Sequence, residues 1–154
     1  MRIVIVTPTY YPNVNGASYF AQRLAHYHKE RGHSVLVIAP SRSTRHEAYH
    51  FDDVSIFGIR SFPIFVNDLR IAQSFGIKRV LRRVIEDFSP DIIHLQSHLF
   101  FDKVVLKIAK EKNIPIVGTN HFMPENLIHY LHLPQSLEKY VKRAAWRGLH
   151  KVYE

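Results

Sequence analysis

The sequence predicts an α/β domain built on a doubly wound, mainly parallel β-sheet that is flanked by helices. This prediction rests on four short runs rich in isoleucine and valine, at residues 2–6, 34–39, 91–95 and 114–118. None of the runs alternates cleanly with polar residues, which is typical of strands buried on both faces of a parallel sheet. Helical patterns lie between the runs, and this alternation favours right-handed crossovers that cover both faces.

Three segments have the spacing expected of crossover helices. Residues 18–31 follow the first run and stop at Gly32, a residue that often ends helices. Residues 77–88 repeat apolar side chains every three or four positions and end before Ser89 and Pro90. Residues 100–112 link the third run to the fourth. Each segment therefore lies where a parallel sheet needs a connection.

Two parts of the chain have less regular patterns. Within residues 41–65, the stretch VSIFGIRSFPIF at 54–65 is expected to hold one or two strands, with Pro63 at an edge or a break because proline cannot donate a ladder hydrogen bond. The tail after Pro134 is expected to be helical, with Gly148 interrupting it. No linker or internal repeat divides the sequence, so residues 1–154 are expected to form one domain.

The composition limits the partners and the compartment. The chain has 154 residues and no cysteine, which excludes disulfides, cysteine zinc ligands and a thiol nucleophile, and fits a reducing cytoplasm. Its 21 Lys and Arg against 13 Asp and Glu, a formal charge of +8, favour nucleic acid, anionic lipid or phosphorylated substrates as partners. The apolar start is too short for a signal peptide, and no run reaches transmembrane length.

The turn after the first run, TPTYYPNVNGASYF, is the first candidate site. Ligands of doubly wound sheets bind beyond the carboxyl ends of the strands, and Asn15 and Gly16 fall there, at the start of the first helix. A glycine lets an anion approach the backbone, and the free amides of a first helical turn favour negative charge. Asn15 and Gly16 are therefore a candidate phosphate site, although an Asn-Gly pair is also an ordinary turn.

The stretch IPIVGTNHFMPEN is the second candidate site, because it places polar side chains where a buried strand should end. His121 could donate a hydrogen bond to a substrate or exchange a proton near neutral pH. Glu125 and Asn126 add an acceptor and an amide for a bound substrate. In the alternative, His121 hydrogen-bonds the loop backbone and Glu125 with Asn126 begins a helix.

The stretch DIIHLQSH is the third candidate site. His94, Gln96 and His98 alternate at the end of the third run, so they share one side of the strand and could line a polar cleft. The histidine pairs lack a carboxylate at a recognised ligand spacing and no HExxH is present, so we expect no metal site.

The helix at residues 77–88 is the fourth candidate. Lys78, Arg79, Arg82 and Arg83 are expected on one face, opposite the apolar positions. Such a cationic strip could rest on anionic lipid headgroups, or it could be an ordinary solvated face. No aromatic residues alternate with these cations for base stacking, so we do not expect nucleic acid as the partner.

Together these stretches resemble one enzyme family. MRIVIVTPTYYPNVNGAS, RGHSVLVIAP, PDIIHLQSH and IPIVGTNHFMPEN occur in the order seen in the amino-terminal domain of family 4 retaining glycosyltransferases, which have the GT-B fold. The resemblance covers nearly the whole chain. The segment GTNHFMPENLIHYL is most similar to that of the diacylglycerol glucosyltransferases and phosphatidylinositol mannosyltransferases. The resemblance implies a Rossmann-like domain that is one half of a GT-B fold.

The resemblance also implies roles for single residues. Gly16, with Asn15 beside it, matches the glycine loop that approaches the donor diphosphate, although many members have two glycines there. His121 matches the histidine that contacts the donor sugar near its reacting centre. Gln96 and His98 match the loop that lines the acceptor pocket. The basic helix matches, more loosely, the membrane-docking helix of the lipid-specific members.

These resemblances lead us to expect a hexosyltransferase that takes a nucleoside-diphosphate sugar as donor and needs no metal. The expected acceptor is a hydroxyl of a membrane glycerolipid, with the protein on the cytoplasmic, inner face of the cell membrane. Family members are about twice as long, so this chain is expected to lack the carboxy-terminal donor-binding domain and to be inactive alone. A soluble sugar or sugar-phosphate acceptor, and a non-enzymatic basic membrane-docking module, are the alternatives.

Overall fold

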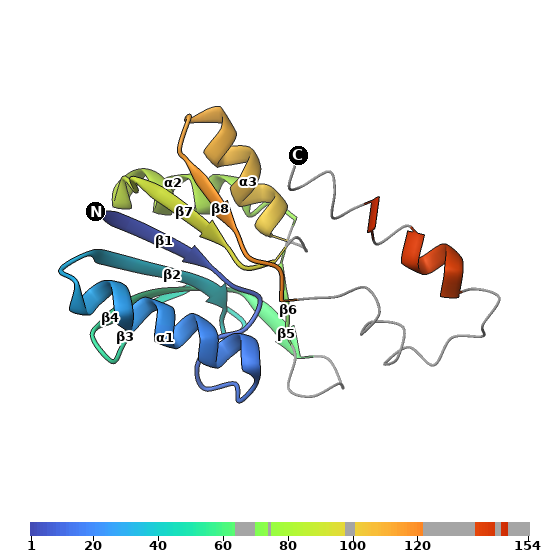
Figure 1. Ribbon diagram of the computed structural model, residues 1–154, viewed down its shortest axis with the longest axis horizontal. Coiled ribbons are helices and arrows are strands. Elements are labelled where there is room, and N and C mark those ends of the chain that lie inside the picture. Colours follow the sequence, from blue (N-terminus) through green and yellow to red (C-terminus); the bar gives the residue numbers. More distant parts are fainter. Residues whose placement is uncertain (64–69, 74, 98–100, 122–137, 144–145, 148–154) are drawn as a thin grey trace.

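The computed structural model describes residues 1–63, 70–73, 75–97, 101–121, 138–143 and 146–147. Its main sheet has the strand order β3-β4-β2-β1-β7-β8, and every neighbouring pair is parallel except the antiparallel pair β3 and β4 (Figure 1). The predicted doubly wound, mainly parallel α/β fold is therefore confirmed. The strands of this sheet are β1 (Arg2–Val6), β2 (Ser34–Pro40), β3 (Glu47–Phe51), β4 (Val54–Ile59), β7 (Ile92–Leu95) and β8 (Ile116–Gly118).

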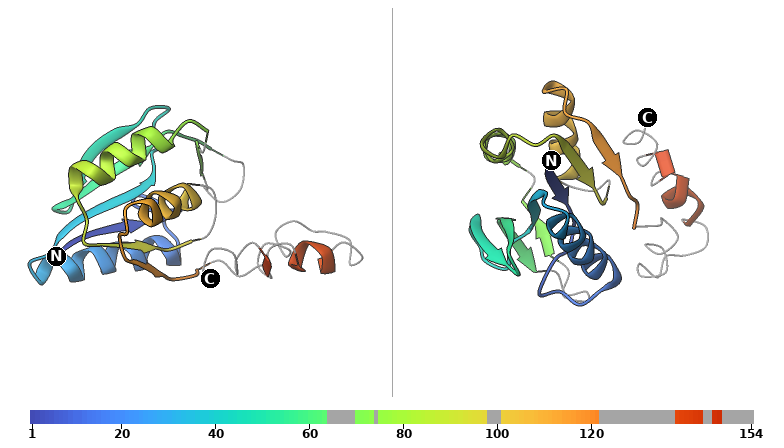
Figure 2. Two further views of the ribbon diagram at one scale, coloured as in Figure 1. Left: turned by 90° about the horizontal axis from the view of Figure 1, so that it is seen from above. Right: turned by 60° about the vertical axis from the view of Figure 1, so that its left-hand side comes forward.

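Helices cover both faces of this sheet, as Figures 1 and 2 show. On β1, Ile3 and Ile5 pack with α1 (Gly16–Glu30), through its small buried residues Ala21 and Ala25. Val4 and Val6 point to the opposite face, where they join the core formed with α2 (Lys78–Phe88) and α3 (Asp102–Glu111). Because successive side chains of a strand point to opposite faces, a strand covered on both sides must be apolar throughout.

The prediction of one or two strands in residues 54–65 is confirmed, because the described part of this stretch contains β4 and β5 (Ser61–Pro63). Two neighbouring strands were not predicted: β3 forms a hairpin of the main sheet with β4, and β6 (Arg70–Ala72) pairs with β5 in a separate two-stranded sheet. The turn between β3 and β4 places Asp52 and Asp53 at φ values of 51° and 60°. Two successive residues with positive φ make the tight turn that matches the twist of a hairpin, and aspartate tolerates this conformation.

The fourth apolar run is less buried than expected. It ends in β8, where Val117 is 45% exposed. Among the described residues β8 pairs only with β7, so it forms an edge of the sheet and one side of it lacks a neighbouring strand. The expectation of a fully buried strand was wrong here, because position in the sheet cannot be read from a short apolar run.

The first turn of α3 contains a buried carboxyl group. Asp102 is fully buried, and its Oδ2 accepts a hydrogen bond from the Ser97 hydroxyl, whereas Oδ1 has no partner among the described residues. Burial raises the pKa of the Asp102 carboxyl from 3.8 to about 7, although the Ser97 hydroxyl and the backbone amide of Asp102 oppose this shift. The folded chain therefore favours the protonated form of Asp102 in mildly acidic solution.

This burial predicts a pH dependence that Asp102→Asn should remove. The pKa of this carboxyl group is 3.8 in the unfolded chain and about 7 in the folded chain. Ionisation therefore favours the unfolded chain, and the free energy of unfolding falls progressively as the pH rises between these values. Between pH 5 and pH 8 the free energy of unfolding of Asp102→Asn should rise relative to the parent chain by about 2–3 kcal/mol. Urea unfolding at both pH values measures this difference, with the exposed Asp87→Asn as matched control. Parallel pH profiles for the parent and Asp102→Asn would show that Asp102 folds ionised.

Candidate functional site

The carboxyl ends of three neighbouring strands meet at one edge of the sheet. The backbone N–H of Gln96 donates to the carbonyl of Val6 (2.8 Å), and the backbone N–H of Thr119 donates to the carbonyl of Leu95 (2.8 Å). The segments that follow β1, β7 and β8 therefore start side by side, and α1 begins at the same edge (Figure 1). This edge brings Gly16, Gln96 and His121 to the same end of the sheet.

The loop between β1 and α1 is held by hydrogen bonds around Thr9. The hydroxyl of Thr7 donates to the carbonyl of Thr9 (2.8 Å), and the amide nitrogen of Asn15 donates to the hydroxyl of Thr9 (2.9 Å). The amide oxygen of Asn15 accepts from the backbone N–H of Ser18 (2.9 Å), so Asn15 is the N-cap of α1. Both ends of this side chain hold the loop, and Asn15 thus acts on any ligand here by positioning the helix start.

Gly16 leaves open space at the first position of α1. It is exposed, its φ lies outside the left-handed region, and a Cβ built on it would meet nothing within 4 Å. The fold therefore does not require a glycine at this position. The N–H groups of Gly16 and Ala17 lie in the first turn, where helix geometry supplies no acceptor, and no acidic side chain occupies this turn. An anion could approach these two amides closely.

His121 faces the first turn and a half of α1. Its ring meets the ring of Phe20 edge to face, with the centroids 4.6 Å apart. The Nε2 atom of His121 is buried and has no hydrogen-bond partner among the described residues. Burial lowers the pKa of His121 below its ordinary value, so the neutral imidazole predominates at pH 7. The alternative in which this nitrogen caps the loop backbone finds no such bond in the described part of the chain.

Two side chains at the end of β7 differ in their hydrogen bonding: His94 has a partner, and Gln96 has none among the described residues. The Nε2 atom of His94 lies 2.8 Å from the hydroxyl of Thr119, the residue that follows β8. Burial, with His28 and His121 nearby, lowers the pKa of His94. Gln96 is fully buried, and neither its amide oxygen nor its amide nitrogen has a partner in the described structure. Unused hydrogen-bonding capacity in a buried amide is rare, because it costs about 1–3 kcal/mol.

Three of the predicted site residues cannot be placed. His98, Glu125 and Asn126 lie outside the described residues, so their assignment to the acceptor remains a prediction. Sequence reasoning passed over Thr9 and Phe20, which hold the loop and His121 respectively. The signal for Phe20 was its spacing, since it lies four positions after Gly16 on the same face of a helix.

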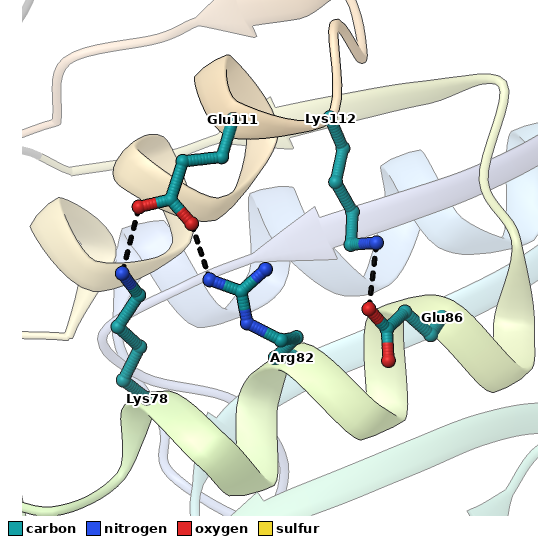
Figure 3. Close-up of polar contacts among 5 residues, drawn as sticks. All are labelled: Lys78, Arg82, Glu86, Glu111 and Lys112. Atoms are coloured by element: carbon teal, nitrogen blue, oxygen red, sulfur yellow. Dashed lines mark hydrogen bonds and ion pairs between the residues drawn. The ribbon is translucent and has the colours of Figure 1, made fainter.

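The predicted cationic strip of α2 is split by ion pairs to α3 (Figure 3). Lys78 Nζ lies 2.7 Å from Glu111 Oε1, and the guanidinium of Arg82 binds the other oxygen of the same carboxylate. These two cations lower the pKa of Glu111 to about 2. One turn further along α2, Glu86 pairs with Lys112 (2.6 Å). Lys78 and Arg82 thus join the two helices, whereas Arg79 and Arg83 form no ion pair among the described residues. Contact of the four cations with a membrane stays a prediction.

The outward charge on this side of the sheet comes from both helices. Arg79 and Arg83, one turn apart, are exposed on α2, and three lysines of α3 are also exposed: Lys103, Lys107 and Lys110. In the parts of the chain that the structure describes, no carboxylate forms an ion pair with any of these five residues. The exposed cations therefore extend over both helices, which is a broader surface than the sequence indicated. On α2 they are Arg79 and Arg83, two of the four predicted residues.

The described residues contain no group of three His, Cys, Asp or Glu side chains that could hold a metal ion. No helix formed by these residues is both long and apolar enough to span a bilayer.

Comparison with known proteins gives a consistent set of relatives. The model of Glycosyltransferase Family 4 matches residues 14–153. The chain is 30% identical over 132 residues to alpha-monoglucosyldiacylglycerol synthase of Streptococcus pneumoniae, which covers 85% of this chain and 29% of that protein. It is 31% identical over 121 residues to a GDP-mannose-dependent alpha-mannosyltransferase of Corynebacterium glutamicum, covering 77% of this chain and 28% of that protein.

A second alpha-monoglucosyldiacylglycerol synthase and a solved structure extend this comparison. The alpha-monoglucosyldiacylglycerol synthase of Acholeplasma laidlawii is 27% identical over 153 residues, covering 99% of this chain and 37% of that protein. The structure of sucrose-phosphate synthase from Thermosynechococcus elongatus superposes with a TM-score of 0.58 at 10% identity, over 93% of this chain and 39% of that one, which is a likeness of fold. The chain spans about a third of the length of the curated relatives it matches.

Proposed function

This chain belongs to glycosyltransferase family 4, and from that membership we propose that it is the acceptor-binding half of a retaining glycosyltransferase. The whole enzyme moves a hexose from a nucleoside-diphosphate sugar to a hydroxyl group of a membrane glycerolipid. A second domain outside this chain supplies the rest of the donor site, so the chain alone is inactive. Two relatives named as monoglucosyldiacylglycerol synthases support the lipid acceptor.

The observation that carries this proposal is the meeting of two unsatisfied polar groups at one edge of the sheet. The first-turn amides at Gly16 have no helical acceptor, and the buried Nε2 of His121 has none among the described residues. Phe20 lies one turn after Gly16 and contacts the His121 ring, so a single short helix segment positions both groups. A sugar diphosphate carries both an anion and hydroxyl groups, so one such molecule has a group suited to each of these sites.

This arrangement suits the chemistry of sugar transfer. The reaction places charge on the departing diphosphate, and amide dipoles that are already oriented stabilise that charge without reorganisation. A neutral imidazole can accept or donate a hydrogen bond to the sugar near its reacting carbon. In this proposal, amides and basic side chains neutralise the diphosphate, and the enzyme needs no resident metal.

The acceptor side is proposed to include the buried end of β7. The unpartnered amide of Gln96 can exchange hydrogen bonds with an acceptor hydroxyl, once movement of the surrounding segments exposes it. The exposed cations of α2 and α3 then hold the protein peripherally on the anionic inner face of the cell membrane, at about 1 kcal/mol per basic residue near the surface.

Gly16→Ala should separate donor binding from folding. A Cβ at this position meets no atom of the chain, so the free energy of unfolding should stay within about 1 kcal/mol of the parent value. The same Cβ enters the space proposed for the diphosphate, so kcat/KM for the donor in the full-length enzyme should fall at least tenfold. Gly58→Ala is the contrasting control, because its Cβ would lie 3.0 Å from the Cβ of Ser41 and should reduce stability. Unchanged donor kinetics in Gly16→Ala would remove the phosphate site from this edge.

His121→Ala in the full-length enzyme should reduce kcat far more than it reduces stability. Loss of a transition-state hydrogen bond in a site of this kind costs roughly 10²–10³-fold in rate. Because burial lowers the pKa of His121, the decline of the parent activity in acid should have its midpoint below pH 6.5, the ordinary pKa of a histidine. Steady-state kinetics and thermal unfolding measure the two effects, with the exposed His50→Ala as control. Equal losses of rate and stability would make His121 a structural residue.

The split of the cationic strip predicts different effects for two double variants with the same change of charge. Arg79→Gln with Arg83→Gln removes outward cations, so binding of the chain to phosphatidylglycerol-containing vesicles should weaken about 30-fold, or roughly 2 kcal/mol, without loss of stability. Lys78→Gln with Arg82→Gln breaks the pairs to Glu111, so it should reduce stability and affect vesicle binding less.

Sedimentation with vesicles and thermal unfolding provide the two readings. Vesicles of phosphatidylcholine alone control for charge. Equal losses of vesicle binding in the two double variants would indicate that total charge matters and that the division seen between the helices does not. The proposed acceptor surface would be contradicted if the full-length Arg79→Gln, Arg83→Gln variant transferred sugar to lipid at the parent rate. Transfer to a soluble sugar instead of a lipid would contradict it as well.

A further inference from the structure

The two-stranded sheet β5–β6 and the turn that follows it expose three large apolar side chains. Phe62 is 47% exposed, Ile71 is 38% exposed and Phe75 is 91% exposed. Phe62 and Ile71 lie directly opposite each other on the antiparallel pair, so they form one apolar surface. Phe75 lies three residues after the end of β6 and three residues before the start of α2. We refer to Phe62, Ile71 and Phe75 as the hairpin face.

The rest of the hairpin is firmly attached to the main sheet. Ser61 and Ala72, the neighbouring pair along the same two strands, are both buried. Arg70 Nε donates to the carbonyl of Ser41 (2.9 Å) and to the hydroxyl of Ser61 (2.7 Å). The backbone N–H of Gln73 donates to the carbonyl of Arg60 (2.8 Å). One side of the hairpin is therefore anchored, and the hairpin face is its outward side.

One cation contacts this apolar surface, and two more follow it closely along the chain. The guanidinium of Arg60 lies over the Phe62 ring, 5.2 Å from its centroid. Arg79, exposed in the first turn of α2, comes four residues after Phe75, and Arg83 follows one turn later. Aromatic and aliphatic side chains next to exposed arginines have the composition of a surface that lies in the boundary between lipid headgroups and acyl chains.

The position of the hairpin connects it with the proposed site. β5 follows the carboxyl end of β4, and Ser41, which follows β2, accepts the hydrogen bonds that hold it. Figure 1 shows β5 and β6 at the end of the sheet to which the parallel strands point, the same end as the start of α1. A surface that contacts the hairpin face therefore lies next to the edge that holds Gly16 and His121.

From these observations we infer that the hairpin face inserts into the headgroup region of an anionic bilayer, while Arg60, Arg79 and Arg83 contact the lipid phosphates. Three side chains are too few for a stable protein interface, which buries about 800 Å² on each partner. Shallow insertion into lipid needs no such area, because apolar contact and charge attraction add together. The inference rests on the proposed lipid-acceptor function for its purpose, but insertion can be measured without any sugar transfer.

A single labelled cysteine tests insertion directly, because the chain has no cysteine of its own. Phe75→Cys, labelled with a polarity-sensitive dye, should show a blue-shifted emission and protection from an aqueous quencher when vesicles of phosphatidylcholine with phosphatidylglycerol are added. Tyr27→Cys on α1, at a position that is 49% exposed, is the matched control and should report water throughout. A dye at position 75 that stays in water while the chain sediments with the vesicles would overturn the inference.

Salt separates the apolar contribution from the charge contribution. High salt screens the arginines, so the parent chain should keep part of its vesicle binding at 0.5 M salt through the hairpin face. Phe62→Ser with Phe75→Ser should weaken that residual binding at least tenfold, whereas Tyr27→Ser should not change it. Unchanged residual binding in the double variant would also overturn the inference. If the dye at position 75 enters lipid but the full-length enzyme uses only soluble acceptors, the proposed acceptor fails and the insertion stands.

Discussion

The parallel pairing of β1 with β7, and of β7 with β8, is the constraint on which the site depends. Parallel strands in register bring their carboxyl ends to one edge, and two backbone hydrogen bonds continue the pairing beyond the strands, at Gln96 and Thr119. Residues about a hundred positions apart in the sequence, Gly16 and His121, therefore share a small region. The side chains there supply chemistry, but the hydrogen-bond ladder determines which of them can meet.

The sequence was most informative where one physical requirement dominated. Strands covered on both faces need continuous apolar side chains, and the runs that became β1, β2 and β7 showed that pattern clearly. Residues 41–72 were harder to interpret, because β3 and β4 join through an Asp52-Asp53 turn that lacks the usual glycine. In β8, a run of the same composition lies at the edge, and only its pairing partners reveal this.

The candidate site was predictable to the level of strand ends, and less so at the level of side chains. That Gly16 and His121 would lie at the carboxyl edge followed from the order of strands and helices. That Asn15 would be engaged by Thr9 and Ser18, and that Phe20 would contact His121, depends on loop geometry that no local pattern encodes. The division of the basic helix depended on Glu111, which lies 33 residues from Lys78 and cannot be paired with it from spacing.

The ion pairs of Glu111 have a consequence for a domain that rests on charged lipid. An anionic membrane attracts protons, and a surface potential of about −30 to −50 mV makes the adjoining water more acidic by roughly half a pH unit or somewhat more. The pKa of Glu111, near 2, lies far below any acidity reached there, so its carboxylate stays ionised. The ion pairs that join α2 to α3 would therefore persist at the membrane surface. The exposed arginines of α2 would keep their positions relative to α3 as the domain moves from bulk water to the membrane.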